Sequence, residues 1–301
     1  MVDFTNRVAI VTGAGGGLGR AHAHLLASLG AAVVVNDLGG TVHGEGSSEG
    51  AADVVVAEIT EAGGTAVADY NSVAAPESAQ AIVDHTIAEF GTVDVLINNA
   101  GILRDRSFTN LTFDELRSVL DVHLRGAFYV SQPAFAHMKA RGYGRIIMTS
   151  SASGIMGNFG QTNYGAAKMG LIGFMNVLAL EGAKHGIGVN AIAPIAATRM
   201  TEGLLGEVLE YFQPELVSPA VAFLASEDCD LTAELWSVGG GSVSRMFIAL
   251  ADGYFKHPES GAITVEDIVA NLEEIRSEDG YIVPFSSQDE FAKLGPKLLD
   301  I

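Results

Sequence analysis

The sequence predicts a doubly wound α/β fold with a parallel sheet, built as a single domain followed by a C-terminal tail. Short runs of Val, Ile and Ala alternate with longer segments that have the apolar period of a helix. The short runs are nearly continuous, which is typical of strands buried on both faces of a parallel sheet. Strands and helices that alternate at this spacing indicate repeated βαβ units, whose right-handed crossovers produce a doubly wound sheet.

These patterns predict each element in turn. The predicted strands span residues 7–11, 32–36, 65–68, 93–97, 144–148 and 187–192. The predicted helices span residues 18–29, 49–62, 76–90 and 163–183. Glycines end the first two helices and Pro76 opens the third, as helix-boundary preferences require.

No Pro/Ser-rich linker divides residues 1–243, so we expect one domain there. Residues 244–301 are predicted to be an extension that packs on this domain or on a neighbouring subunit. In the extension, Thr264 is a predicted N-cap of a helix with one apolar stripe, formed by Val265, Ile268, Val269, Leu272 and Ile275. A glycine-rich insert at residues 38–50 is longer than the usual loop of about 2–6 residues.

Charge and composition exclude several classes of function. The 301 residues include 17 Lys and Arg against 36 Asp and Glu, a net charge of −19, which argues against nucleic acid or an anionic membrane as a partner. Cys229 is the single cysteine, so no intramolecular disulfide and no Cys-based metal site is expected. We see no secretory signal and no apolar run of about 18 residues, so we expect no membrane partner and a cytoplasmic location.

A glycine-rich turn between the first strand and the first helix predicts a phosphate site. The turn reads Thr12-Gly13-Ala14-Gly15-Gly16-Gly17-Leu18-Gly19. Glycine lets the backbone approach a pyrophosphate, and the helix N-terminus offers free N–H groups. Asp37 ends the second strand, where a carboxylate accepts both ribose hydroxyls and repels a 2′-phosphate. The sequence therefore predicts NAD rather than NADP, while a solvated loop acid is the alternative for Asp37.

A Tyr and a Lys one helical turn apart predict acid–base chemistry. Tyr164 and Lys168 share one face of a helix, and an ammonium near a phenol lowers the phenol pKa. Ser151 follows a predicted strand, at the edge where parallel sheets bind ligands. Its hydroxyl would hold a carbonyl oxygen while Tyr164 exchanges the proton, which suits hydride transfer with a nicotinamide. A Tyr/Lys pair at this spacing, taken alone, more often has a structural role. Its combination with the glycine-rich turn makes a catalytic role the favoured interpretation.

Taken together, these residues resemble the short-chain dehydrogenase/reductase family, whose fold is of the Rossmann type. The resemblance covers about residues 4–242 and rests on four motifs: Thr12-Gly13-x-x-x-Gly17-x-Gly19, Asn98-Asn99-Ala100-Gly101, Ser151, and Tyr164-x-x-x-Lys168. More narrowly, residues 35–40, 98–108, 123–126 and 144–160 resemble the (3R)-hydroxyacyl-CoA dehydrogenase unit of peroxisomal multifunctional enzyme type 2, also called 17β-hydroxysteroid dehydrogenase type 4.

The resemblance implies a role for each matching residue. Ser151 would position the substrate oxygen, Tyr164 would be the general acid/base, and Lys168 would hold the ribose and tune Tyr164. The implied NAD contacts are Gly13, Gly17, Leu18 and Gly19 in the turn, Asp37 at the ribose, Ser72 and Val73 near the adenine, Asn99, Ala100 and Gly101 along the adenosine half, Tyr164 and Lys168 themselves, and Ala196, Ala197 and Thr198 near the nicotinamide. No metal is expected.

The chain departs from the common family pattern at two places. His123 stands where many members carry an Asn that holds a water in a proton relay. Pro194-Ile195 replaces the common Pro-Gly. Residues 171–180 are apolar nearly all round, so we expect them to be buried, and in this family such a helix packs between the subunits of a dimer or tetramer.

We therefore expect an NAD-dependent oxidoreductase that interconverts a (3R)-hydroxyacyl-CoA and its 3-oxoacyl-CoA. A hydroxysteroid or a steroid side-chain CoA thioester is the alternative substrate. A non-catalytic nucleotide-sensing protein is the alternative of another class. The relatives carry further domains and reside in peroxisomes, whereas this chain ends Leu298-Leu299-Asp300-Ile301 without a peroxisomal address, so a freestanding homo-oligomer in the cytoplasm is expected. The insert at residues 38–50 would either gate the adenine side or form a mobile surface loop.

Overall fold

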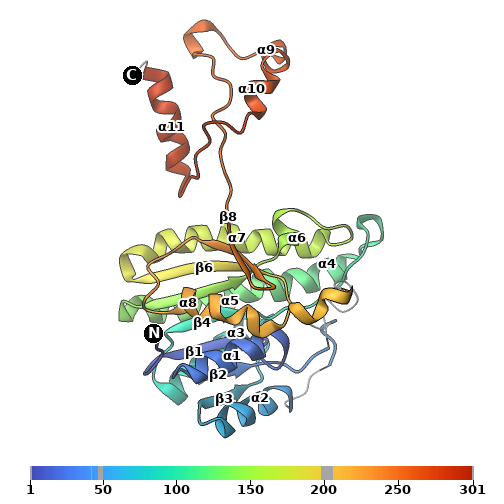
Figure 1. Ribbon diagram of the computed structural model, residues 1–301, viewed down its shortest axis with the longest axis vertical. Coiled ribbons are helices and arrows are strands. Elements are labelled where there is room, and N and C mark those ends of the chain that lie inside the picture. The colour runs from blue at the N-terminus through green and yellow to red at the C-terminus, as the bar shows by residue number, and fades with distance from the viewer. Residues whose placement is uncertain (1, 42, 47–49, 198–205, 300–301) are drawn as a thin grey trace. The chain divides into compact units, whose positions relative to one another are not determined.

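The computed structural model describes residues 2–41, 43–46, 50–197 and 206–299. The chain divides into two compact units, residues 1–245 and residues 246–301. The first unit holds an eight-stranded sheet with helices on both faces (Figure 1). The predicted doubly wound α/β fold is confirmed. The predicted packing of the extension on the domain or on a neighbouring subunit stays a prediction.

The strands run in the order β3-β2-β1-β4-β5-β6-β7-β8 across the sheet. Their bounds are β1 Val8–Thr12, β2 Ala32–Asn36, β3 Thr65–Asp69, β4 Val95–Asn98, β5 Gly144–Thr149, β6 Ile187–Pro194, β7 Leu235–Gly239 and β8 Ser242–Met246. The pairs from β3 through β7 are all parallel. Neither β7 nor β8 was predicted from the sequence. β8 follows β7 after only Gly240-Gly241, both at positive φ, so β7 and β8 form an antiparallel hairpin.

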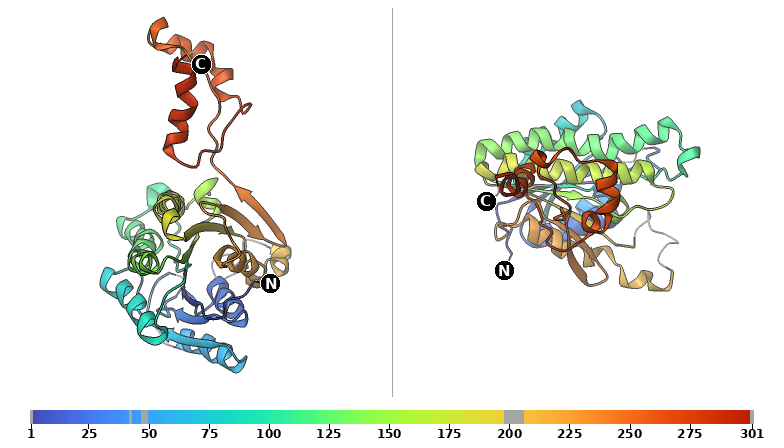
Figure 2. Two further views of the ribbon diagram at one scale, coloured as in Figure 1. Left: turned by 90° about the vertical axis from the view of Figure 1, so that its left-hand side faces the viewer. Right: turned by 90° about the horizontal axis from the view of Figure 1, so that it is seen from above.

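Helices cover both faces of the sheet (Figure 2). On one face lie α1 (Gly17–Ser28), α2 (Gly50–Glu61) and α8 (Ser218–Ala225), and on the other lie α3 (Pro76–Phe90), α5 (Gly126–Arg141) and α7 (Thr162–Gly182). The helix α4 (Phe113–Leu120) runs into α5 through a π-helical turn, Asp121–Arg125, and the short α6 (Ala152–Ile155) follows β5. The apolar strands fill the core, since every residue of β1 and β4 is buried.

The order of the strands determines where a ligand can bind. The chain proceeds outward from β1 through β2 to β3, and then returns to place β4 on the other side of β1. At such a reversal the loops after β1 and β4 diverge to opposite faces and leave a crevice at the carboxyl ends of the strands. All the predicted functional motifs follow the carboxyl end of a strand, so the topology gathers them along this edge.

The helix α7 is only half buried, although its sequence is apolar nearly all round. Together with a short 3₁₀ extension it forms Thr162–His185, which is long and apolar enough by composition to span a bilayer. Leu171, Ile172 and Met175 are buried in the fold, whereas Val177 is 56% exposed. The single chain therefore leaves the outer face of residues 171–180 exposed, and the predicted packing of this helix between subunits stays a prediction.

The second unit contains α9 (Val265–Ala270), α10 (Leu272–Arg276) and α11 (Ser287–Leu299). Thr264 caps α9 in a reciprocal capping box with Asp267, as its sequence predicts. The predicted apolar stripe does not form one helix, because the chain leaves the helical conformation at Asn271. None of the described residues of this unit is buried. With 56 residues and no core of its own, the unit is too small to be stabilised by internal burial alone.

Candidate active site

A cavity of about 460 Å³ opens at the carboxyl edge of β1, β2 and β4. Nine of the predicted cofactor residues line it: Gly13, Gly17, Leu18, Asp37, Ser72, Val73, Asn99, Ala100 and Gly101. Sequence reasoning missed several other lining residues, among them Asn71, His43, Ser118 and Asp121. These four lie in loops or on a helix outside the recognised motifs, so their sequence positions carry no signal for a ligand.

The glycine turn is packed against the loop that follows β4. The side chain of Asn99 donates hydrogen bonds to the carbonyl oxygens of Thr12 and Gly13, at 3.0 and 3.1 Å. Gly19 lies behind the turn rather than on the cavity wall, and a Cβ there would lie 2.2 Å from Gly13 O. A Cβ at position 19 would also lie 2.7 Å from Asn99 Nδ2, so neither neighbour leaves room for a larger side chain there. The backbone of the turn therefore stays open toward the cavity.

Asp37 is held at the end of β2 by two backbone donors. Its carboxylate accepts hydrogen bonds from Gly15 N at 2.8 Å and from Gly39 N at 2.7 Å. A carboxylate offers about four acceptor positions, so two are left for a ligand in the cavity that Asp37 lines. The two backbone donors therefore hold the Asp37 carboxylate in place at the cavity wall.

Ser151, Tyr164 and Lys168 lie together beside this cavity. Ser151 is the N-cap of α6, where its hydroxyl accepts a hydrogen bond from Ser153 N at 3.2 Å, and it lies close enough to Tyr164 of the adjacent α7 to act on the pKa of that phenol. Lys168 Nζ lies 5.4 Å from the centroid of the Tyr164 ring and donates a hydrogen bond of 2.5 Å to Thr149 O, the last residue of β5. A small cavity touching Lys168 shares Val73, Ala100 and Val122 with the large one, so Lys168 adjoins the wall of the large cavity, whereas Ser151 and Tyr164 line neither of these two cavities.

Burial determines the protonation of Tyr164 and Lys168. Burial raises the pKa of Tyr164, the hydrogen bond from Ser151 acts to lower that pKa, and Asp105 raises it slightly. This is opposite to the predicted lowering by Lys168, because in the chain alone the loss of hydration outweighs other contributions. Lys168 is 3% exposed, and burial lowers its own pKa to about 7. At neutral pH the phenol therefore keeps its proton and the ammonium is close to titrating.

His123 contacts this group from the π-helical turn. Its ring meets the Tyr164 ring edge-on, with 5.1 Å between centroids. Nε2 lies 2.7 Å from Ile102 O, and among the described residues the buried Nδ1 has no hydrogen-bond partner. Burial and then the charge of Lys168 hold the pKa of His123 well below its usual value, so the ring is neutral. These contacts do not test whether His123 takes part in a proton relay.

The predicted residues after β6 are only partly described. Ala196 is buried, and Ala197 N donates a hydrogen bond to Phe212 O at 2.5 Å. Thr198 lies outside the described residues. Neither Ala196 nor Ala197 lines the large cavity, although both follow β6 at the same carboxyl edge of the sheet.

The two arginines that follow the β4 loop are engaged in ion pairs. Arg104 lies 3.2 Å from Glu45 of the glycine-rich insert, and Arg106 lies 3.2 Å from Glu115. His43 of the insert also contacts Leu103 O, with 3.1 Å between Nδ1 and the oxygen. The described part of the insert is thus attached to the loop after β4, beside the large cavity.

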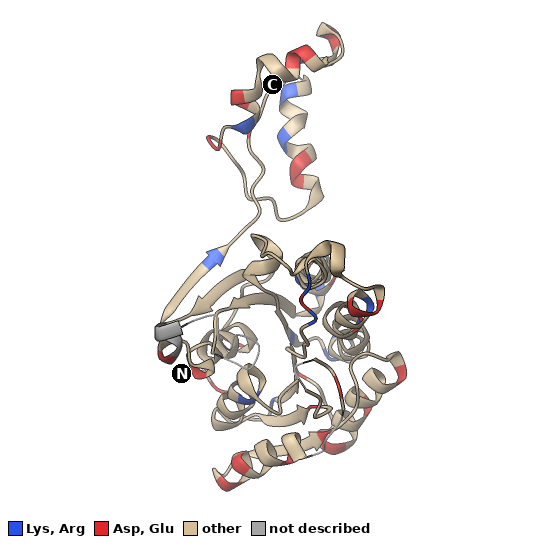
Figure 3. Ribbon diagram, turned by 90° about the vertical axis from the view of Figure 1, so that its right-hand side faces the viewer, with Lys and Arg blue, Asp and Glu red and all other residues tan. Residues whose placement is uncertain are grey.

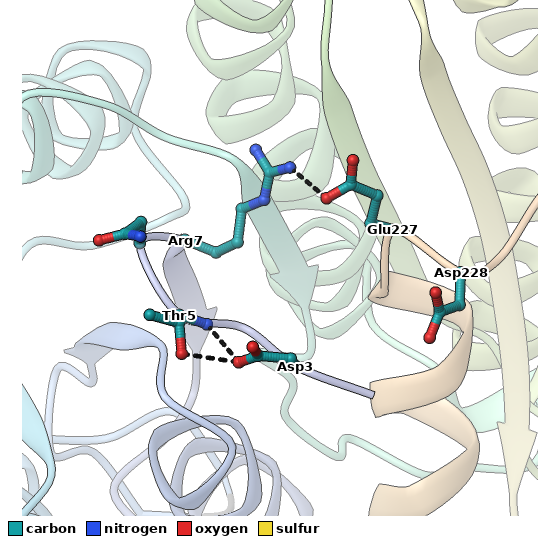
Figure 4. Close-up of a pocket in the computed structure, with 6 residues that line it drawn as sticks. Asp3, Thr5, Arg7, Glu227 and Asp228 are labelled. Carbon is teal, nitrogen blue, oxygen red and sulfur yellow. Dashed lines mark hydrogen bonds and ion pairs between the residues drawn. The ribbon is translucent and has the colours of Figure 1, made fainter. Parts of the chain in front are cut away.

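A second cavity, of about 450 Å³, lies near the amino end of β1 and contains none of the predicted residues (Figure 4). Its polar groups satisfy one another: Arg7 pairs with Glu227 at 2.6 Å, and the Asp3 carboxylate accepts hydrogen bonds from Thr5. Parallel α/β sheets bind ligands at the opposite edge, so the candidate active site is the group at the carboxyl ends.

Comparison with known proteins identifies related chains. Residues 7–206 match the short chain dehydrogenase family. The chain is 50% identical over 282 residues to a short-chain type dehydrogenase/reductase of Mycobacterium tuberculosis, covering 93% of this chain and 97% of that protein. It is 40% identical over 253 residues to a 3-oxoacyl-[acyl-carrier-protein] reductase of Synechocystis, covering 81% of this chain and 99% of the reductase.

A multifunctional enzyme is similar over part of its length. The chain is 49% identical over 274 residues to peroxisomal multifunctional enzyme type 2 of Drosophila melanogaster, covering 89% of this chain and 45% of that enzyme. The solved full-length structure of the Drosophila enzyme matches with a TM-score of 0.84 and 38% identity, covering 99% of this chain and 50% of the other. This chain thus spans about half the length of that relative.

The buried ammonium of Lys168 gives the stability a pH dependence. Its folded-state pKa of about 7 lies below the reference value of 10.5, so between these pH values the unfolded chain binds one more proton. The free energy of unfolding gains at most about 1.4 kcal/mol per pH unit from this group as pH rises through that range. Lys168→Met removes the gain, so we expect its stability to fall relative to wild type as pH rises.

Urea unfolding at several pH values between about 6 and 10 measures this difference. Lys139→Met, which alters an exposed lysine of α5, is the control and leaves the pH dependence unchanged. A constant offset between Lys168→Met and wild type across the range would contradict the buried-ammonium interpretation.

Proposed function

Because the chain belongs to the short-chain dehydrogenase family, we propose that it is an NAD-dependent enzyme that interconverts a secondary alcohol and a ketone, with a (3R)-hydroxyacyl-CoA and its 3-oxoacyl-CoA as the substrate pair. The observation that carries the proposal is the approach of Ser151 to Tyr164 beyond the end of β5, with the Lys168 ammonium 5.4 Å from the centroid of the Tyr164 ring. Two relatives support an acyl substrate: the 3-oxoacyl-[acyl-carrier-protein] reductase of Synechocystis and the peroxisomal multifunctional enzyme type 2 of Drosophila.

The residues of the large cavity fit a dinucleotide. The glycine turn has no Cβ at the points of closest backbone approach, and the N-terminus of α1 supplies free N–H groups for a pyrophosphate. Asp37 would accept the hydroxyls of the adenine ribose with the acceptor positions that Gly15 and Gly39 leave free. A 2′-phosphate at that position would meet a fixed carboxylate, which supports NAD over NADP. The nicotinamide supplies hydride exchange with the substrate carbon.

Ser151 and Tyr164 handle the substrate oxygen. In the reducing direction the Tyr164 hydroxyl gives its proton to the ketone oxygen, while Ser151 Oγ donates a hydrogen bond to the same oxygen. In the oxidising direction Tyr164 takes the hydroxyl proton and must first be a phenolate. Burial raises the pKa of Tyr164, so the protonated phenol suits reduction at neutral pH and oxidation gains as pH rises.

Replacing the phenol tests the assignment of Tyr164. Tyr164→Phe keeps the ring packing against His123 but removes the exchangeable proton. We expect turnover of 3-oxoacyl-CoA with NADH to fall by at least about 10²-fold, the lower range for general acid catalysis, while NADH binding is retained. The assay follows NADH absorbance, and calorimetry measures binding. Turnover equal to wild type would contradict the mechanism.

The same assay across substrates tests the substrate class. A panel of (3R)- and (3S)-hydroxyacyl-CoA thioesters of several chain lengths, a free 17β-hydroxysteroid and a steroid side-chain CoA thioester distinguishes the alternatives. Preference for the (3R)-thioesters is the expected result. Turnover of the free steroid alone would replace the acyl proposal with hydroxysteroid dehydrogenation.

Asp37 tests the choice of cofactor. Asp37→Ala removes the carboxylate that would repel a 2′-phosphate, so we expect NADPH binding to strengthen and NADH binding to weaken. The expected change in the NADH/NADPH affinity ratio is tenfold or more, on the order of one charge-assisted hydrogen bond. Asp53→Ala, on the neighbouring α2, is a control whose carboxylate bonds Tyr70 outside the cavity. A wild-type protein that prefers NADPH would refute the NAD proposal.

An exposed apolar face on α5 and α7 supports a homodimer or homotetramer. Phe128 and Phe174 stack with 3.7 Å between ring centroids, which joins the two helices. Phe128, Val177 and Leu180 remain exposed. A contiguous apolar face on a monomer is typical of an interface, and we infer that a second copy of the chain covers it. A cytoplasmic location stays a prediction.

Val177→Glu tests this interface. A carboxylate in the centre of an apolar contact is strongly unfavourable, so we expect a shift to a smaller species in sedimentation velocity. Val54→Glu introduces the same change at an exposed valine of α2 and should leave the oligomer intact. A monomeric wild-type chain would contradict the proposal directly.

A further inference from the structure

Asn163 is a buried amide that the proposed mechanism does not use. It directly precedes Tyr164 in the first turn of α7, and it is 1% exposed. Burying an amide is unfavourable unless both its oxygen and its NH₂ group find hydrogen-bond partners. The partners of Asn163 therefore indicate what this residue does.

Each end of the Asn163 amide bonds a backbone group of opposite polarity. Oδ1 accepts a hydrogen bond from Tyr164 N at 2.8 Å, and Nδ2 donates one to Arg104 O at 2.9 Å. An N–H group cannot accept and a carbonyl oxygen cannot donate, so these two partners allow only one orientation of the amide. The Asn163 side chain thus joins the backbone at Tyr164 to the loop after β4.

The bond to Tyr164 N satisfies a donor at the start of the helix. The first N–H groups of an α-helix have no acceptor within the helix. At the start of α7, Gly165 N donates to Gln161 O at 2.7 Å, which leaves Tyr164 N ahead of the helical hydrogen-bond pattern. The N-cap residue Gln161 makes no side-chain cap hydrogen bond. Asn163 Oδ1 supplies the acceptor instead.

The other end of the link belongs to the wall of the large cavity. Arg104 lines that cavity, and its guanidinium pairs with Glu45 while its carbonyl oxygen accepts from Asn163. The same loop contains residues 99–102, which line the cavity as well. One buried amide therefore connects the backbone of the phenol to the wall of the proposed cofactor site.

Two further links join the same segments, but they involve exposed residues. Gln161 Nε2 donates to Asp105 Oδ2 at 2.7 Å, and Arg106 N donates to Gly160 O at 2.9 Å. Asp105 and Arg106 are exposed, so water competes for these bonds. The Asn163 amide is shielded from water, where a hydrogen bond is electrostatically stronger. We therefore expect Asn163 to keep the two segments together when the outer links open.

We propose that Asn163 is a positioning residue that holds Tyr164 at a fixed place relative to the dinucleotide site, by joining Tyr164 N to Arg104 O. The inference rests on the proposed function, in which reduction adds a hydride to the carbonyl carbon of the substrate and the Tyr164 proton to its oxygen. The phenol must therefore lie at a set distance from the nicotinamide. A misplacement of about 1 Å can slow such a step about 10²-fold.

A single-turnover measurement tests the positioning role. NADH-bound protein is mixed rapidly with a 3-oxoacyl-CoA, and the loss of NADH absorbance gives the rate constant. We expect Asn163→Ala to lower it by about tenfold to 10²-fold, with an NADH dissociation constant within about twofold of wild type. A variant that is merely less stable would lose amplitude and keep the rate constant, because only its folded fraction reacts.

Asn163→Asp separates the two hydrogen bonds of the amide. Its carboxylate has the same shape and still accepts from Tyr164 N, but it places a second acceptor against Arg104 O. We expect its rate constant to fall as far as that of Asn163→Ala. A rate constant equal to wild type in Asn163→Asp would show that the link to Arg104 is dispensable and would overturn the inference.

Hydrogen–deuterium exchange of the protein without NADH gives a readout that does not depend on activity. Asn163→Ala removes the acceptor of Tyr164 N, so exchange should become faster in the first turn of α7. Exchange at Met175, in the buried middle of the same helix, should stay as in wild type. Faster exchange along the whole helix would indicate a general loss of stability and would contradict the positioning role.

Two controls isolate the buried link. Asn110→Ala makes the same change at an exposed asparagine whose amide bonds Ser107, and it should leave the rate constant unchanged. Gln161→Ala removes the link to Asp105 and should lower the rate constant by less than about threefold, because water replaces an exposed hydrogen bond at little cost. A loss in Gln161→Ala as large as that in Asn163→Ala would overturn the assignment to Asn163.

The outcomes separate this inference from the proposed function. A wild type that reduces the 3-oxoacyl-CoA while Asn163→Ala has the same rate constant overturns the inference and leaves the proposed function intact. A wild type that neither binds NADH nor reduces the substrate removes the proposed function itself. If Asn163→Ala does not fold, Asn163→Asp decides by the same rate constant.

Discussion

The hydrogen bond from the buried Lys168 ammonium to Thr149 O ties α7 to the end of β5, and the candidate active site depends on it. An ammonium with so little access to water is stable only where a fixed oxygen accepts a hydrogen bond from it. The Ser150 hydroxyl adds a second link, since it donates to Lys168 O at 2.8 Å. These two bonds fix the register of α7 against β5, and Tyr164 therefore lies where the N-cap of α6 presents Ser151.

The carboxylates near the cavity are also held by specific hydrogen-bond and ion-pair partners. The chain has a large acidic excess (Figure 3), but the acids near the cavity are individually engaged. Asp37 accepts two backbone N–H groups, Asp69 accepts four hydrogen bonds, and Glu45 pairs with Arg104. Fixed carboxylates of this kind discriminate between ligands by position, whereas solvated acids would act only through a screened long-range field. The acidic surface and the selectivity of the site are therefore separate properties.

The second unit raises a different question, which is how residues 246–301 are stabilised. Its helices expose apolar side chains such as Val265, Val269 and Phe291, while Lys293 and Lys297 contact Asp252 within the unit. Polar links of this kind contribute little in water, so they do not by themselves account for the stability of the unit. Apolar side chains are exposed on α5 and α7 as well, among them Phe128 and Val177.

The sequence by itself predicted the parallel sheet, the glycine turn, Asp37 and the set of Ser151, Tyr164 and Lys168. Each of these follows from a local pattern, namely apolar runs, a turn that needs glycine, or residues one helical turn apart. The sequence did not show β7, β8, the π-helical turn or the break at Asn271, which depend on packing that no local pattern encodes. Only the tertiary structure decided the direction of the Tyr164 pKa, since burial and not the neighbouring lysine dominates it. Only the tertiary structure brought Asn36, Asp69, Asn71 and His85 together, because their meeting requires β2, β3 and α3 to be already in register.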